Sequence, residues 1–134
     1  FLRSVKFSNS WDGDSIRVFD LGECAPIDEL ICKLYLHVRM EAESPGDAVA
    51  WADLKATLTQ LYDKLITPAA GWLSAETQYG AGWIIIPDGL LWQLPFEALC
   101  IPDGRFLVEA VTVSYAHSLR ARFWAQLRSD PHLA

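Results

Sequence analysis

The sequence has no hydrophobic run long enough to cross a membrane as a helix, because no stretch approaches about 18 consecutive apolar residues. Basic charge is also scarce: 11 Lys and Arg stand against 17 Asp and Glu, for a net charge of −6. Nucleic-acid phosphates require a basic surface, so this balance argues against DNA or RNA as a partner. We therefore expect neither a membrane nor a nucleic acid as partner.

Cysteine and methionine are few as well. The three cysteines, Cys24, Cys32 and Cys100, are odd in number and form no CxxC pair, so they do not make a disulfide framework. Each lies in an apolar setting, which favours a reducing, cytoplasmic compartment. The chain has no signal peptide, and its only methionine is Met40. We therefore expect a chain that has been processed or cut from a longer one.

Apolar and aromatic residues are plentiful: hydrophobic residues make up 51% of the 134 residues, and six residues are tryptophan. That content excludes an intrinsically disordered chain and is sufficient for one hydrophobic core. The sequence contains no internal repeat and no low-complexity segment. Residues 1–134 are therefore expected to be a single domain or a fragment of one.

The most strand-like stretch is the unbroken apolar run Trp83-Ile84-Ile85-Ile86. It is rich in β-branched residues and is bounded by Gly82 and Pro87, which predicts a strand buried on both faces. The turn triplet Pro87-Asp88-Gly89 follows it directly.

The same triplet returns at residues 102–104. It separates residues 96–101 from residues 106–108, and this arrangement predicts a β-hairpin. One more strand is predicted over residues 111–115. The segments that precede these strands in the sequence are expected to be mainly helices that cover the strands.

Two amphipathic helices are predicted upstream, after a strand over residues 15–21. The first helix should run from Pro26 to about Glu41, with His37 at its partly exposed margin. Its apolar residues recur at helical spacing and are Ile27, Leu30, Ile31, Leu34 and Val38.

The second helix should begin after a Ser44 cap and end or kink at Pro68. We expect its buried face to pack against the strand 84–86. That face consists of Trp51, Leu54, Leu58, Leu61 and Leu65. A third helix, capped by Ser118, should follow the last strand. This order of elements predicts an α/β domain with helices flanking a mixed sheet.

No complete active site emerges from the residues themselves. The histidines are His37, His117 and His132, and a pairing of Cys100 with His117 is conceivable, although neither lies in a motif that activates a thiolate. His117 follows a predicted strand end, where α/β active sites often lie. Catalytic residues are therefore predicted to be absent from this chain.

Four carboxylates could have either a structural or a functional role. Asp88 follows a buried strand, but turn chemistry accounts for it, and Glu97 could be a buried carboxylate that pins its turn. Asp12 and Asp14 have a spacing that can hold a divalent cation, yet the rest of a calcium-loop pattern is missing and a turn is favoured. No phosphate loop and no metal-ligand cluster occur, so no cofactor and no metal are expected.

Several motifs follow one another in the second half of the chain. They are LYDKLITP at 61–68, IIIPDG at 84–89, LPFEAL at 94–99, PDGRFLVE at 102–109 and VSY at 113–115. This succession resembles the first part of CHAT domains, which are related to caspases and separases and are commonly attached to tetratricopeptide repeats. The resemblance covers about residues 15–127.

The resemblance implies a caspase-like α/β fold, present here as a partial domain. Active members of the family are cysteine peptidases with a His–Cys dyad, the histidine in an H-G motif and the cysteine in an S-A-C-x-x-G type motif. Both would lie downstream of Leu127, and neither occurs here. His117 stands where the family commonly has proline, Cys100 occupies a variable position, and Trp92 departs from the family pattern.

Two functions follow from this resemblance. In the first, the chain is the N-terminal, non-catalytic segment of a CHAT peptidase and acts as a scaffold or regulatory part, with the remainder of its own domain as partner. In the second, it is a stand-alone, inactive protein-interaction module. Self-association is possible in either case, because a partial sheet exposes an open edge.

Overall fold

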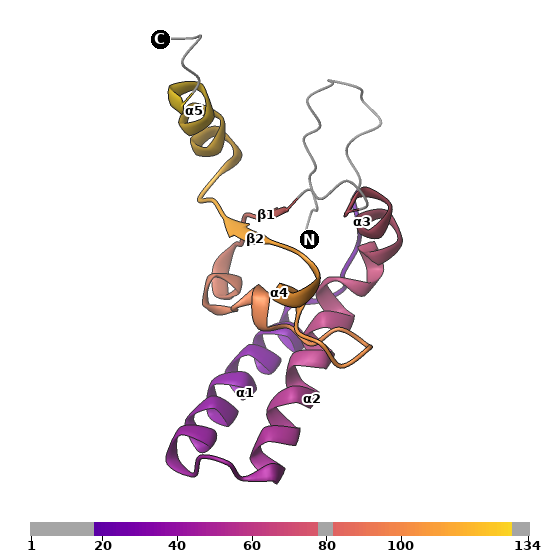
Figure 1. The fold of residues 1–134 in the computed structure, drawn as a ribbon, viewed down its shortest axis with the longest axis vertical. Helices are drawn as coiled ribbons and strands as arrows, with labels where there is room; N and C mark the ends of the chain where they lie inside the picture. Colours follow the sequence, from indigo (N-terminus) through magenta and orange to yellow (C-terminus); the bar gives the residue numbers. More distant parts are fainter. Residues whose placement is uncertain (1–17, 78–81, 130–134) are drawn as a thin grey trace.

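A computed structural model describes residues 18–77 and 82–129. Helices dominate, and a small sheet lies beside the end of the helical hairpin (Figure 1). The elements are α1 (Cys24–Glu43), α2 (Ala48–Leu65), α3 (Ala70–Thr77), β1 (Trp83–Ile85), α4 (Leu107–Ala110), β2 (Val113–Tyr115) and α5 (Leu119–Ser129). Three 3-10 helices connect them: η2 (Thr67–Ala69), η3 (Gly89–Gln93) and η4 (Phe96–Ala98).

The antiparallel pair α1 and α2 supplies half of the core (Figure 1). The short segments after β1 supply most of the rest, through Leu91, Leu94, Phe96, Leu99, Cys100 and Leu107. The helical residues of the core are Ile27, Ile31, Leu34, Leu54, Leu58, Leu61 and Leu65. Both helices therefore bury one apolar stripe, as their periodicity predicts.

Three residues of these helices were placed wrongly by the sequence pattern. His37, predicted at an exposed margin, is buried with 7% exposure, whereas Val38 faces outward. Steps of three and of four from Leu34 both stay near one helix face, so the pattern cannot choose between residues 37 and 38. Trp51 is 45% exposed and packs edge-on against Phe106, at 6.4 Å between ring centroids.

The start and the surroundings of α2 also differ from the prediction. The cap is Asp47, whose carboxylate accepts a hydrogen bond from the Val49 N–H at 2.9 Å, rather than Ser44. The buried face of α2 packs chiefly on α1, not on the strand. The end is as expected: α2 stops at Leu65, and Pro68 lies in the 3-10 turn η2 before α3 resumes.

The sheet consists of β1 and β2, which pair in parallel with Trp83 opposite Val113 and Ile85 opposite Tyr115. Gly82 allows the two strands to meet at this end, because a Cβ there would lie 3.0 Å from the Thr112 carbonyl oxygen. The mixed sheet expected from the sequence is thus a two-stranded parallel one within the described residues. This coarse architecture is compatible with an α/β fold.

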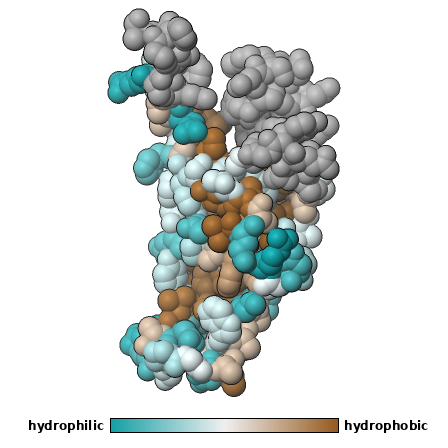
Figure 2. Space-filling model, in the orientation of Figure 1, coloured by the Kyte–Doolittle hydropathy of each residue, from teal (hydrophilic) through white to brown (hydrophobic). Residues whose placement is uncertain are grey.

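The strand at 83–85 is not buried on both faces. Trp83, Ile85 and Val113 pack against the core, while Ile84 and Ile86 are 45% and 36% exposed. The described part of the chain has no third strand. Figure 2 shows hydrophobic surface in the middle of the molecule, at the level of the sheet and the turns below it.

The predicted hairpin exists only as a single antiparallel bridge between Cys100 and Phe106. Residues 96–98 form η4 and residues 107–110 form α4, so neither arm is a strand. The part of the expected strand 15–21 that is described, residues 18–21, is not a strand either. Short apolar runs do not distinguish strands from tight helical turns.

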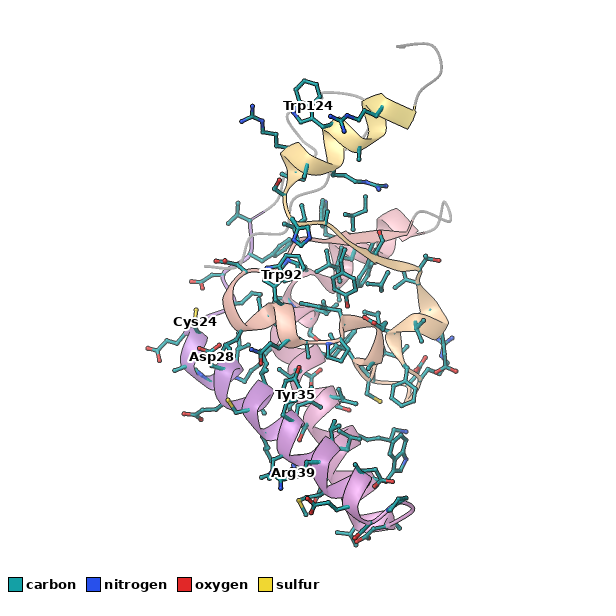
Figure 3. All side chains as sticks on the ribbon, turned by 90° about the vertical axis from the view of Figure 1, so that its left-hand side faces the viewer. Cys24, Asp28, Tyr35, Arg39, Trp92 and Trp124 are labelled. Carbon is teal, nitrogen blue, oxygen red and sulfur yellow. The ribbon has the colours of Figure 1, made fainter. Side chains whose placement is uncertain are left out.

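The last helix, α5, extends away from the other described elements (Figures 1 and 3). Its cap is the predicted one, because the Ser118 hydroxyl accepts a hydrogen bond from the Ala121 N–H at 3.0 Å. Trp124 on this helix is exposed, and so is Trp92 on η3. No helix among residues 18–77 and 82–129 has the length and apolar character of a membrane span.

Candidate functional site

The clearest polar arrangement joins η4 to β2. The hydroxyl of Tyr115 donates a short hydrogen bond to Oε2 of Glu97 and accepts one from the Phe96 N–H at 2.9 Å. The rings of Phe96 and Tyr115 lie 6.4 Å apart between centroids. Glu97 therefore does pin its turn, as the sequence predicted, by binding the end of the second strand, but it is half-buried rather than buried.

Burial and the hydrogen bond to Glu97 raise the pKa of Tyr115 to about 12. The phenol therefore keeps its proton throughout the physiological pH range and remains a donor to the carboxylate. This arrangement places one negative charge, on Glu97, beside a neutral aromatic ring. It offers no nucleophile, because a tyrosine that retains its proton is not activated.

A shallow pocket of about 370 Å³ opens beside this junction. Its lining comes from α1, from the segment around η3 and η4, and from β2. The lining residues are Tyr35, Trp92, Gln93, Leu94, Pro95, Glu97 and Tyr115. Its volume lies near the lower end of the roughly 300–1,000 Å³ typical of ligand pockets.

Tyr35 is the pocket residue that the sequence did not predict. It lies on the side of α1 that faces η3, and its hydroxyl donates a hydrogen bond of 2.6 Å to the Gln93 carbonyl oxygen, 58 residues away. Figure 3 shows Tyr35 and Trp92 on the same side of the molecule. No local pattern marks Tyr35, because its role arises only when α1 packs beside η3.

The conceivable Cys100–His117 pair is not supported by the surroundings of the two residues. Cys100 is buried in the core, at the bridge to Phe106. His117 is exposed and stacks on the ring of Trp92, at 5.0 Å between centroids. Among the described residues, no hydrogen bond connects the two side chains.

The other residues considered as site candidates in the sequence are Asp88, Asp12, Asp14 and His132. Asp88 is exposed, and its carbonyl oxygen accepts the Leu91 N–H at 3.1 Å, which is a turn contact. Asp12, Asp14 and His132 lie outside the described residues. Within residues 18–77 and 82–129, no three His, Cys, Asp or Glu side chains form a group that could hold a metal ion.

Comparison with protein families matches residues 55–132, more than half of the chain, to the CHAT domain. The chain belongs to the CHAT domain family. The match includes the second half of α2, both strands, η3, η4 and α5, and it leaves α1 outside. No curated protein and no solved structure shows significant similarity to the chain.

The CHAT segment and the pocket coincide in part. Trp92, Glu97 and Tyr115 belong to the matched region, whereas Tyr35 comes from α1, which precedes it. Two of the motifs that carried the resemblance, LPFEAL and VSY, meet at the hydrogen bond between Tyr115 and Glu97. In this CHAT chain these motifs therefore join a turn to a strand.

Proposed function

We propose that this chain is the N-terminal, non-catalytic segment of a caspase-like cysteine peptidase of the CHAT family and acts there as a scaffold or regulatory part. The observation that carries the proposal is the incomplete sheet: β1 and β2 pair only with each other among the described residues. Parallel sheets are normally covered by helices on both faces, and this one exposes Ile84 and Ile86.

The surroundings of the sheet support an associating surface. Leu90, Trp92 and Leu119, which follow the two strands closely in the sequence, are exposed as well. Contiguous exposed apolar surface marks interaction sites, and these side chains are candidates for such a surface. The sequence itself contains neither an H-G nor an S-A-C-x-x-G motif, so the chemistry of the family would come from elsewhere.

The proposed partner is the downstream remainder of the same peptidase domain. Its strands would extend the sheet and its helices would cover the outer face, because an open parallel edge pairs readily with a further strand. The alternative is a stand-alone interaction module, in which another protein or a second copy takes that place. Both options use the same surface and differ in the identity of the occupant.

The test begins with the parent reading frame, which should continue into the two dyad motifs. Co-expression of the 134-residue chain with that downstream segment should give a stable complex with a higher thermal midpoint than either part. The chain alone should hydrolyse none of a panel of Arg-, Lys- and Asp-ended fluorogenic peptides. Ile84→Asp should weaken the complex, while Leu36→Asp, on the outer side of α1, should not.

A monodisperse monomer at high micromolar concentration that gains no stability from the downstream segment would overturn the proposal. Self-association of the chain in light scattering, abolished by Ile84→Asp, would instead favour the stand-alone module. Turnover of any peptide that disappears on replacing Cys100 or His117 would refute the non-catalytic assignment.

A further inference from the structure

The pocket beside Glu97 has the composition of a site for a cation. Three aromatic rings from separate elements surround it: Tyr35 from α1, Trp92 from η3 and Tyr115 from β2. Glu97 adds the only charged side chain of the lining. The faces of such rings attract cations, and a carboxylate beside them supplies the opposite charge.

The three rings are held in place before any ligand arrives. The Tyr35 hydroxyl is bound to the Gln93 carbonyl oxygen, and the Tyr115 hydroxyl lies between the Phe96 N–H and the Glu97 carboxylate. Trp92 stacks on His117 with 29° between the ring planes. Side chains already fixed by such contacts lose little conformational entropy when they bind.

The charge around the pocket is negative. Within the described residues, only Oε2 of Glu97 has a hydrogen-bond partner, so Oε1 is open to a ligand. Asp28 lies two turns before Tyr35 on the same side of α1 (Figure 3). The nearby Arg39, one turn after Tyr35, is bound to Glu43 at 2.9 Å.

We propose that this pocket binds the guanidinium group of an arginine side chain carried by an extended segment of a partner protein. A planar guanidinium can stack on an aromatic ring while one of its N–H groups donates a charged hydrogen bond to the open Oε1 of Glu97, and a compact ammonium group does not stack in this way. The pocket is shallow, so the rest of the segment would remain outside it. This inference does not rest on the proposed scaffold role, because it is carried by Glu97, Tyr35 and the rings around them, although Trp92 and Tyr115 also lie at or next to the sheet.

The test uses the peptide acetyl-Gly-Arg-Gly-amide, titrated into the 134-residue chain and followed by isothermal calorimetry and NMR shifts of the tryptophan indoles. Two peptides serve as ligand controls: one with citrulline, which keeps the shape and removes the charge, and one with lysine. We expect arginine to bind more tightly than lysine, and citrulline to bind at least tenfold more weakly.

Two variants examine the two parts of the site. Glu97→Gln keeps an acceptor for Tyr115 and removes the charge, and it should weaken arginine binding about tenfold or more, as expected for loss of a charged hydrogen bond. Trp92→Leu should weaken it roughly threefold to thirtyfold, the range of cation–π contacts. Glu29→Gln, an exposed change on another face of α1, removes the same charge and should leave binding unchanged.

Equal binding of the arginine and citrulline peptides would overturn the proposal, as would equal losses for Glu97→Gln and Glu29→Gln. Circular dichroism on each variant separates a lost site from a lost fold. The arginines of α5 provide another possible occupant. If the chain self-associates, and Arg122→Gln abolishes this while the peptide does not bind, the pocket serves a second copy rather than a partner protein.

Discussion

Truncation of Leu61 should be among the most destabilising single changes in this chain. Leu61 is fully buried, with 0% exposure, in the face of α2 that packs on α1. The change to alanine removes about three carbon groups at about 0.8 kcal/mol each, or about 2.4 kcal/mol of transfer free energy. The cavity left in the packed core adds to this, so we expect a loss of about 3 kcal/mol.

Urea denaturation followed by circular dichroism at 222 nm measures this loss. With a slope near 2 kcal/mol per molar, the unfolding midpoint should fall by about 1.5 M urea. The matched control is Leu36→Ala on the outer side of α1, where the side chain is 57% exposed and the change should stay within about 0.5 kcal/mol. Equal effects of the two changes would show that the assigned buried face is wrong. If Leu61→Ala does not fold, Ile31→Val on the facing helix should cost about 0.5–1.5 kcal/mol.

Two further predictions concern the cap of α2 and the junction at Tyr115. Asp47→Ala should cost about 0.5–2 kcal/mol in the same assay because it removes the side-chain cap, whereas Ser44→Ala should cost far less; a larger loss at Ser44 would contradict the cap assignment. The pKa of Tyr115 is about 12 in the folded chain and about 10 when unfolded, so its contribution is complete below pH 10 and is lost as the pH rises towards 12. Tyr115→Phe should therefore show a shallower alkaline loss of stability than the parent chain, and identical pH profiles would refute this cause. The same variant should be less stable at pH 7, because Glu97 and the Phe96 N–H lose their partner.

Much of the helical part could be predicted from spacing alone. The stripe Leu54, Leu58, Leu61 and Leu65 is buried as expected, because a helix packed on one side buries residues at steps of three and four. Two helix boundaries could also be predicted from single residues: Pro68 lies just after the end of α2, and Ser118 caps α5. These signals act within a few residues, so they do not depend on the rest of the fold.

The sheet could not be predicted in the same way. The apolar run at 83–86 was expected to be covered on both faces, and Ile84 and Ile86 are exposed. The hydrophobicity of a segment indicates that the strand is favoured by burial. Whether both of its faces are buried depends on which other elements pack against them. The arms of the expected hairpin became η4 and α4, because a three- or four-residue apolar segment fits either geometry.

Only part of the candidate pocket could be predicted from the sequence. Glu97 was expected to pin its turn, but its partner Tyr115 lies 18 residues away, and Tyr35 comes from a helix outside the matched family segment. Contacts between residues so far apart follow from packing and leave no local signature. Trp92 was noted in the sequence as a departure from the family pattern, and in the structure it is exposed and stacks on His117.

The parallel pairing of β1 with β2 has a consequence for the order in which the chain folds. Parallel strands cannot be joined by a tight turn, and here residues 86–112 lie between them. The helical hairpin is built from contacts much closer in sequence, so its loop-closure cost is smaller and it forms earlier. We therefore expect the two strands to meet last, after η3, η4 and α4 have packed on that hairpin. During synthesis, α1 and α2 would thus serve as the template on which the sheet is assembled last.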